Sequence, residues 1–179
     1  MFPTRRLEVL PATVEMLRAE REDRPGFSKL LRARIPASWP PELYNRQAAD
    51  YTLAKLRENP AQEGWWAWYV LRKPAGAQGR TLIGICGFKG PPGADGTVEV
   101  GYGILPEFRR LGYATEATRG MIDRAFSQPG VSRVVAETLP ELRASQGVLR
   151  RIGFRLLGPG SEEGTLRYEL RRAPDVTSG

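Results

Sequence analysis

The chain has 179 residues, of which 41% are hydrophobic and 26% charged, and this balance is typical of one folded domain rather than of a disordered chain. It contains no histidine and one cysteine, Cys86, which excludes Cys/His zinc sites, Ser-His-Asp triads, Cys-His dyads and an internal disulfide. The 27 basic residues against 20 acidic ones favour an anionic partner, either nucleic acid or a phosphorylated cofactor, and solvated surface charge accounts for the surplus equally well.

The N-terminal half alternates short regular segments with irregular ones. In chain order, the hydrophobic spacing predicts a strand over residues 6–10, a helix over 11–21, an irregular segment over 24–41 and a second helix over 47–58. The second helix ends before Pro60, because the residue that precedes a proline favours extended backbone.

The C-terminal half is more regular. Aromatic and β-branched runs predict strands, and apolar residues three and four apart predict helices. The predicted elements are strands over 65–72, 81–88, 98–105, 133–138, 154–157 and 165–170, a helix over 114–126, and a helix that begins at Pro140 and ends at Gly153. The predicted order over residues 98–138 is a strand, a helix and a second strand, which is typical of a βαβ crossover. We therefore expect at least one parallel pair of strands.

The turn before the helix at 114–126 carries the clearest functional signal. Arg109, Gly112 and Ala114 have the spacing Arg-x-x-Gly-x-Ala. The first amides of a helix have no acceptor within it, and the helix dipole adds positive potential worth about 0.3–1 kcal/mol to an anion. Gly112 and Ala114 leave the backbone accessible, and Arg109 and Arg110 add charge, which predicts a pyrophosphate site. A plain connection with two surface arginines is the alternative.

The strand before this turn offers a carboxylate beside bare backbone. Alternation places Glu99, Gly101, Gly103 and Leu105 on one face. Two glycines weaken a strand unless something must approach its backbone, so the pattern predicts a shallow trough that leads from Glu99 to the anion site. A solvated carboxylate and a β-bulge are the alternatives.

These residues resemble a known family. Residues 109–114 match the Arg/Gln-x-x-Gly-x-Gly/Ala pyrophosphate motif of the GNAT N-acetyltransferase superfamily, and residues 140–145 and 151–154 resemble its Asn-x-x-Ser and Lys-x-Gly-Phe elements. The combination is most similar to the branch named for ribosomal-protein alanine N-acetyltransferases. The resemblance covers roughly the C-terminal 100 residues strongly and the N-terminal 60 weakly.

The resemblance implies an α+β fold with a central mixed, mostly antiparallel sheet of about seven strands and helices on both faces. It implies one domain over residues 1–172, a frayed tail over 173–179, acetyl-CoA as co-substrate and no metal. The residues that it implies for acetyl-CoA binding are Ile104, Leu105, Arg109, Arg110, Leu111, Gly112, Tyr113, Ala114 and Thr115, with Ile104 and Leu105 flanking the pantetheine arm through their amides. Leu142 stands where the branch often has Asn, and Arg151 replaces the usual Lys.

The resemblance also implies direct transfer of acetyl from the thioester to an amine. Glu99 is the first candidate for the base, directly or through a water, and such a base contributes about 10²–10⁴-fold. Ser145 matches the serine of the branch and is the first candidate to donate to the leaving thiolate, with a packing role as its alternative. Tyr102 and Tyr113 are weaker donor candidates. A backbone N–H near Ile104 is expected to polarise the thioester carbonyl.

Two other classes stay open. One is a non-catalytic CoA-binding or regulatory module on the same fold, which Leu142 in the Asn position makes conceivable. The other is a basic nucleic-acid-binding domain, against which the basic residues are spread along the chain and interrupted by acids. As partner we expect a small-molecule or peptide amine, with no nucleic acid as primary partner, no membrane, and a homodimer allowed. No apolar run approaches the roughly 20 residues of a membrane helix and the N-terminus lacks an apolar signal segment, so we expect a cytoplasmic protein.

Overall fold

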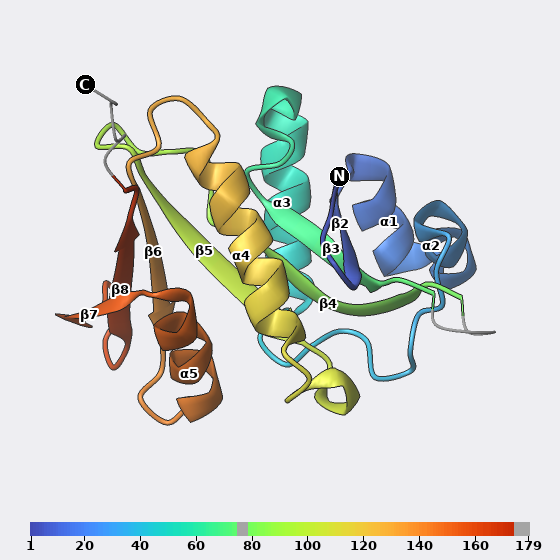
Figure 1. The fold of residues 1–179 in the computed structure, drawn as a ribbon. Coiled ribbons are helices and arrows are strands. Elements are labelled where there is room, and N and C mark those ends of the chain that lie inside the picture. Colours follow the sequence, from blue (N-terminus) through green and yellow to red (C-terminus); the bar gives the residue numbers. More distant parts are fainter. Residues whose placement is uncertain (75–78, 174–179) are drawn as a thin grey trace, which may run out of the picture.

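The computed structural model describes residues 1–74 and 79–173, and in these the chain forms eight strands and five α-helices (Figure 1). The strands are β1 (Phe2–Pro3), β2 (Leu7–Pro11), β3 (Ala67–Arg72), β4 (Thr81–Phe88), β5 (Thr97–Ile104), β6 (Arg133–Thr138), β7 (Arg155–Pro159) and β8 (Leu166–Arg171). The helices are α1 (Val14–Glu22), α2 (Arg24–Leu31), α3 (Arg46–Glu58), α4 (Tyr113–Phe126) and α5 (Arg143–Ile152), with 3₁₀ turns η1 (Pro60–Gln62) and η2 (Pro106–Phe108). The predicted tail lies outside the described residues except for Ala173.

The strands form one mixed sheet in the order β1-β2-β3-β4-β5-β6-β8-β7. Every neighbouring pair is antiparallel except β5–β6, which the predicted βαβ crossover makes parallel. The mixed, mostly antiparallel fold is therefore confirmed. The sheet has eight strands rather than about seven because Phe2 pairs with Val9 and Pro3 with Glu8. A strand of two residues has no alternation that a sequence pattern could reveal.

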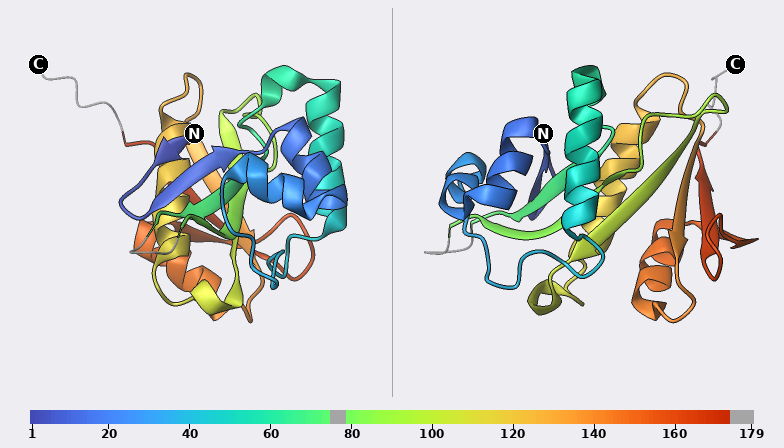
Figure 2. Two further views of the ribbon diagram at one scale, coloured as in Figure 1. Left: turned by 90° about the vertical axis from the view of Figure 1, so that its right-hand side faces the viewer. Right: turned by 180° about the vertical axis from the view of Figure 1, so that it is seen from behind.

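Helices cover both faces of the sheet, as expected. Figure 2 shows α1, α2 and α3 on one face and α4 and α5 on the other. Because both faces are covered at the centre, β4 is buried at all eight positions, and Cys86 within it is 3% exposed. Cys86 thus packs as a small apolar side chain, and burial raises the pKa of its thiol far above the ordinary value.

One helix lies where we predicted an irregular segment. α2 spans Arg24–Leu31, and Asp23 caps it by accepting a hydrogen bond of 2.9 Å from the Gly26 amide. Pro25 and Gly26 are typical of a turn, but a proline in the first helical turn lacks only an N–H that has no acceptor there. The prediction was therefore wrong for residues 24–31 and placed the start of the irregular segment too early.

The last helix begins later than predicted. α5 starts at Arg143, three residues beyond Pro140, and ends at Gly153, whose φ of +112° is the left-handed cap that we expected. The Gln146 side-chain amide donates to the Pro140 carbonyl at 2.7 Å. Residues 139–142 form a turn, in which the Leu142 amide donates to the Leu139 carbonyl at 3.1 Å, and the helix begins after it.

The strands β5 and β6 diverge after a short pairing. They pair only from Thr97↔Arg133 to Glu99↔Val135. Beyond that point β5 stays with β4 as far as Ile104, while β6 stays with β8, and Figure 1 shows the two strands separating. A gap therefore opens in the centre of the sheet, and Glu99 marks its closed end.

Candidate functional site

The edge of β5 that faces the gap carries unpaired backbone groups. The Leu105 amide donates to the Ile83 carbonyl, and the Lys89 amide donates to the Glu99 carbonyl, both at 2.9 Å. In an antiparallel pair, alternate residues direct their N–H and C=O groups to opposite edges. The amides of Tyr102 and Ile104 therefore point into the gap, whereas the Leu105 amide is occupied by β4. Of the two amides that we expected beside the pantetheine arm, Ile104 has the required direction and Leu105 does not.

The glycines of β5 leave one side of this edge bare. A Cβ added to Gly101 would meet nothing within 4 Å, and Gly101 is exposed. A Cβ added to Gly103 would lie 3.3 Å from the Cβ of Pro41, in the loop between α2 and α3. The predicted trough is thus open at Gly101 and bounded by this loop at Gly103.

The N-terminus of α4 presents free amides. Gly112, with φ +81°, precedes the helix without any side-chain cap, and the first helical hydrogen bond runs from the Glu116 amide to the Gly112 carbonyl at 3.1 Å. The amides of residues 113–115 therefore have no acceptor among the described residues. Thr115 is 8% exposed, and its hydroxyl also lacks a described partner. Donors without acceptors at a helix N-terminus suit an anion.

The two motif arginines have different environments. The Arg109 guanidinium donates from Nε to the Ile104 carbonyl at 3.0 Å and from Nη2 to Glu42 at 3.1 Å. These bonds tie Arg109 to the end of β5 and to the loop between α2 and α3. Arg110 is exposed and has φ +61°, and Leu111 beside it is 53% exposed.

Arg6 is a third arginine at this helix end, and sequence reasoning missed it. Its Nη1 donates to the Leu111 carbonyl at 2.9 Å, its Nε lies 2.7 Å from Glu116, and its guanidinium carbon lies 4.5 Å from the Tyr113 ring centre. Burial raises the pKa of Glu116, but hydrogen bonds from Thr4 and Arg6 outweigh it and hold that pKa below its usual value. No local pattern links Arg6 to a turn more than 100 residues away.

Glu99 lies at the closed end of the gap, and its side chain is 18% exposed. Its Oε1 is 2.5 Å from Nζ of Lys89, which is 57% exposed. The strands predicted at 81–88 and 98–105 pair as β4 and β5, and this pairing, which the sequence analysis did not predict, brings Lys89 beside Glu99. Because Lys89 is more than half exposed, the ion pair that it forms with Glu99 is open to solvent.

Ser145 lies on the other face of the sheet, in the first turn of α5. The Tyr102 hydroxyl is 3.0 Å from the Ser145 hydroxyl and donates to the Ser145 carbonyl at 3.1 Å. The structure therefore brings together two of the predicted donors, while Glu99 contacts neither. Tyr113 is buried at the start of α4, and Leu142 precedes α5 with no side-chain cap.

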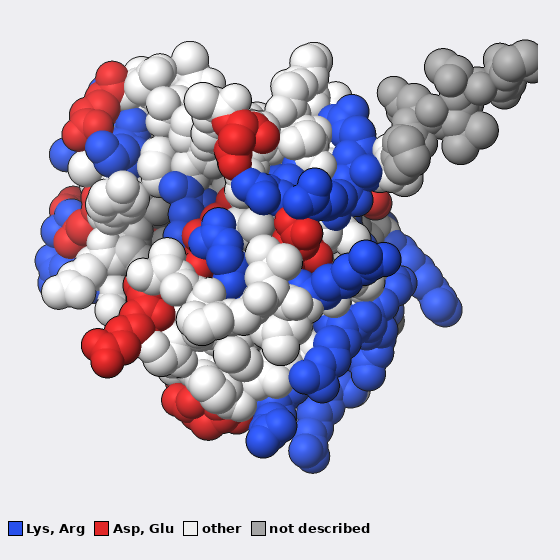
Figure 3. Space-filling model, turned by 90° about the vertical axis from the view of Figure 1, so that its left-hand side faces the viewer, with Lys and Arg blue, Asp and Glu red and all other residues white. Residues whose placement is uncertain are grey.

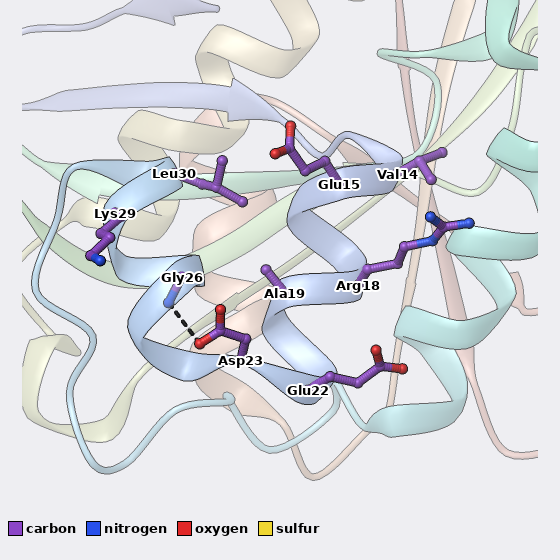
Figure 4. Close-up of a pocket in the computed structure, with 9 residues that line it drawn as sticks. All are labelled: Val14, Glu15, Arg18, Ala19, Glu22, Asp23, Gly26, Lys29 and Leu30. Carbon is purple, nitrogen blue, oxygen red and sulfur yellow. Dashed lines mark hydrogen bonds between the residues drawn. The ribbon is translucent and has the colours of Figure 1, made fainter.

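Two grooves lie outside the gap. One, of about 750 Å³, runs along α4 from Gly112 and Thr115, and its basic side chains include Arg6, Arg119 and Arg151. The other, of about 650 Å³, lies between α1 and α2 and is lined by side chains of both helices (Figure 4). Neither contains Glu99 or Ser145. Only the first is continuous with the predicted anion site.

Basic side chains gather on the side of the molecule that carries α5. Arg143, Arg150 and Arg151 of α5 are exposed, and Arg119 of α4 donates to the Arg151 carbonyl at 3.1 Å. Figure 3 shows Lys and Arg side chains along the lower right border of that face, with acidic side chains mostly elsewhere. This charge lies beside the groove along α4, which favours an anion there.

Neither a membrane-spanning helix nor a metal-binding cluster is found in residues 1–74 and 79–173. No helix in these ranges is long and apolar enough to cross a bilayer. No group of three His, Cys, Asp or Glu side chains in them is arranged to hold a metal ion.

Known proteins resemble this chain in sequence. A family model described as an acetyltransferase (GNAT) domain matches residues 14–155. A Bacillus subtilis (strain 168) protein named uncharacterized N-acetyltransferase YjdG is 28% identical over 154 residues, which are 86% of this chain and 89% of that protein.

Solved structures resemble it in fold. The ribosomal-protein-S5-alanine acetyltransferase from Vibrio fischeri has a TM-score of 0.60 at 18% identity, with 95% of each chain covered. RimL, a ribosomal L7/L12 alpha-N-protein acetyltransferase solved in complex with coenzyme A, has a TM-score of 0.63 at 15% identity, with 94% of this chain and 95% of that chain covered. These likenesses show the fold, and they include the branch that the sequence motifs resemble.

Proposed function

The chain belongs to the GNAT acetyltransferase family and is an acyltransferase, and from this premise we propose that it moves the acetyl group of acetyl-CoA to a primary amine by direct transfer. The acceptor is a protein N-terminus or a small amine, and the reaction takes place in the cytoplasm within one domain over residues 1–172. One observation carries the proposal: β5 has free amides on its edge beside the gap, and the chain continues from the end of β5 through η2 to the uncapped N-terminus of α4.

The diphosphate of acetyl-CoA is the anion that this helix end suits. The amides of Tyr113, Ala114 and Thr115 would donate to it, and the Thr115 hydroxyl would gain the partner that it lacks. Arg6 and Arg110 would supply positive charge. The helix dipole stabilises an anion bound there by about 0.3–1 kcal/mol, and by up to ~2 kcal/mol where the site is partly buried.

The nucleotide end of acetyl-CoA would then lie in the groove along α4. Its ribose carries a third phosphate. Arg119 lines the groove about 10 Å from Gly112 along the axis of α4, at 1.5 Å per residue, and Arg151 of α5 lines the same groove. Exposed arginines suit a phosphate that stays partly in water.

The reacting groups would meet inside the gap. An amine acceptor is an ammonium ion at neutral pH and must lose a proton before it attacks, and Glu99 would accept that proton directly or through a water. The Ile104 amide would donate to the thioester oxygen as negative charge develops on it. Ser145 would donate a hydrogen bond to the departing thiolate from the opposite face.

A single experiment separates enzyme from binding module. We would measure thiol release from acetyl-CoA with a panel of amines and N-terminal peptides, and CoA binding by calorimetry, for wild type, Glu99→Gln and Ser145→Ala. We expect Glu99→Gln to lower kcat about 100-fold or more with little change in CoA affinity. Glu22→Gln, an exposed carboxylate of α1, is the matched control.

The outcomes are distinct. Binding of CoA without release for any amine would favour the non-catalytic CoA-binding or regulatory module. No CoA binding at millimolar concentration would overturn both functions.

A further inference from the structure

On the α5 face, the Tyr102 side chain reaches from β5 to α5 beside the gap between β5 and β6. Tyr102 comes three residues after Glu99, where β6 has already separated from β5. Its hydroxyl reaches the first turn of α5 and lies 3.0 Å from the hydroxyl and 3.1 Å from the carbonyl of Ser145. The side chain of Tyr102 therefore connects the two walls of the gap at the candidate donor to the thiolate.

The single proton of the Tyr102 hydroxyl decides what Ser145 can do. If that proton is donated to the Ser145 carbonyl, the Ser145 hydroxyl donates its own proton to the oxygen of Tyr102. If it is donated to the Ser145 hydroxyl instead, the Ser145 proton becomes free for another acceptor. The two states differ by rotation of two O–H bonds, with no movement of heavy atoms.

The surroundings of Tyr102 favour the protonated phenol. Burial raises the pKa of Tyr102 to about 12, a hydrogen bond from Ser145 opposes the shift, and the nearby Tyr168 adds to it. A thiol has an ordinary pKa near 8.5, so a thiolate cannot take the proton of this phenol to a useful extent. Tyr102 is thus a hydrogen-bond donor and not a general acid.

We infer that Tyr102 is a positioning residue for acyl transfer. Its O–H donates to the Ser145 hydroxyl oxygen, and the Ser145 hydroxyl then donates its own proton in a hydrogen bond to the leaving sulfur. The inference rests on the proposed function. In the transfer, the ammonium ion first gives one proton to Glu99. The amine nitrogen then bonds to the acetyl carbon, the carbon–sulfur bond breaks with its electron pair on sulfur, and the second nitrogen proton passes to water. Ser145 and Tyr102 donate hydrogen bonds only, and the released thiolate takes its proton from water.

A double-mutant cycle tests the inference with the full chain. We would measure kcat and KM for Tyr102→Phe, Ser145→Ala and the double variant. Because Tyr102 acts through Ser145, we expect Tyr102→Phe to lower kcat about tenfold, with KM for acetyl-CoA within twofold of wild type. We expect the double variant to have the kcat of Ser145→Ala alone. Effects of the two substitutions that multiply would overturn the inference, as would an unchanged kcat for Tyr102→Phe.

Tyr168→Phe is the matched control. Tyr168 is fully buried on β8, next to β6, and its hydroxyl has no partner among the described residues. The control removes the same chemical group from the same neighbourhood without touching Ser145, so we expect kcat to stay within twofold of wild type. A loss equal to that of Tyr102→Phe would mean that any lost phenol disturbs the core, and the inference would fall.

The same measurements separate a failure of this inference from a failure of the proposed acetyltransferase function. If Ser145→Ala keeps full kcat, the assigned role of Ser145 fails and the inference fails with it, while acetyl transfer itself stands. If wild type releases no thiol with any amine, the proposed function fails as well.

Discussion

At the scale of single residues, the environment of each carboxylate decides its chemistry. Glu99 faces one exposed lysine, whereas Glu137 on β6 is 4% exposed and accepts from the Ser161 amide at 2.9 Å, the Thr165 hydroxyl at 3.1 Å and Arg167 at 2.6 Å. Glu99 thus has a single ion pair that is open to solvent, whereas Glu137 holds the turn between β7 and β8.

The ionisation of Glu137 makes the free energy of unfolding depend on pH. Burial raises its pKa, but the donors from Ser161, Arg167 and Thr165 outweigh this and lower the pKa to about 2. Because the folded pKa lies below the unfolded value of 4.5, the stabilisation is complete above about pH 4.5 and is lost as the pH falls toward 2. We expect Glu137→Gln to lower Tm by roughly 5 °C at pH 7.

Thermal melts of both proteins across pH check this. The difference in Tm between wild type and Glu137→Gln should narrow from pH 4.5 downward. A difference that stays constant with pH would contradict the assignment.

At the scale of elements, the turn before β2 contributes an arginine side chain to the N-terminus of α4. Arg6 contacts Leu111, Glu116 and Tyr113, so it fixes positive charge beside amides that have no acceptor. Of the two motif arginines, Arg109 is bound to Ile104 and Glu42, so Arg6 adds a second guanidinium beside the exposed Arg110.

Arg6→Gln should therefore weaken cofactor binding. Loss of one partly exposed charge beside a diphosphate predicts a Kd for CoA about tenfold higher by calorimetry, with kcat at saturation nearly unchanged. Arg18→Gln, an exposed arginine of α1, should leave the Kd unchanged. Equal Kd values for Arg6→Gln and wild type would place the diphosphate elsewhere.

At the scale of the whole molecule, the candidate site depends on the division of the sheet between β5 and β6. β4 and β5 continue together with α1 to α3, while β6 continues with β8 and α5, and the gap opens between these halves. Gly101 lies on the open edge, where a Cβ meets nothing within 4 Å.

Filling the gap from Gly101 should block binding and spare the fold. We expect Gly101→Leu to raise the Kd for CoA more than tenfold, because its side chain would occupy the space assigned to the pantetheine arm. Gly101→Ala is the matched control and should retain binding and Tm. Normal CoA affinity in Gly101→Leu would show that the arm does not lie in this gap.

The predicted elements succeeded where they depended on short-range interactions. The strand at 133–138 matches β6, the apolar face of 114–126 forms all but the first residue of α4, and Gly153 ends α5. Helical spacing, strand alternation and caps arise from residues within about four positions of one another, so sequence order carries them. The failures at 24–31 and at Pro140 arose where proline and glycine suit both a turn and a first helical turn.

The sequence by itself determined the α4 motif, the glycine-bearing strand before it and the absence of histidine chemistry, because each is local or compositional. Only the tertiary structure decided that Arg6 reaches α4, that Lys89 pairs with Glu99, that Tyr102 meets Ser145, and that Ile104 rather than Leu105 directs its amide into the gap. These contacts depend on which strands neighbour one another and in which register. That choice is made by burial of the whole core, and no short stretch of chain contains it.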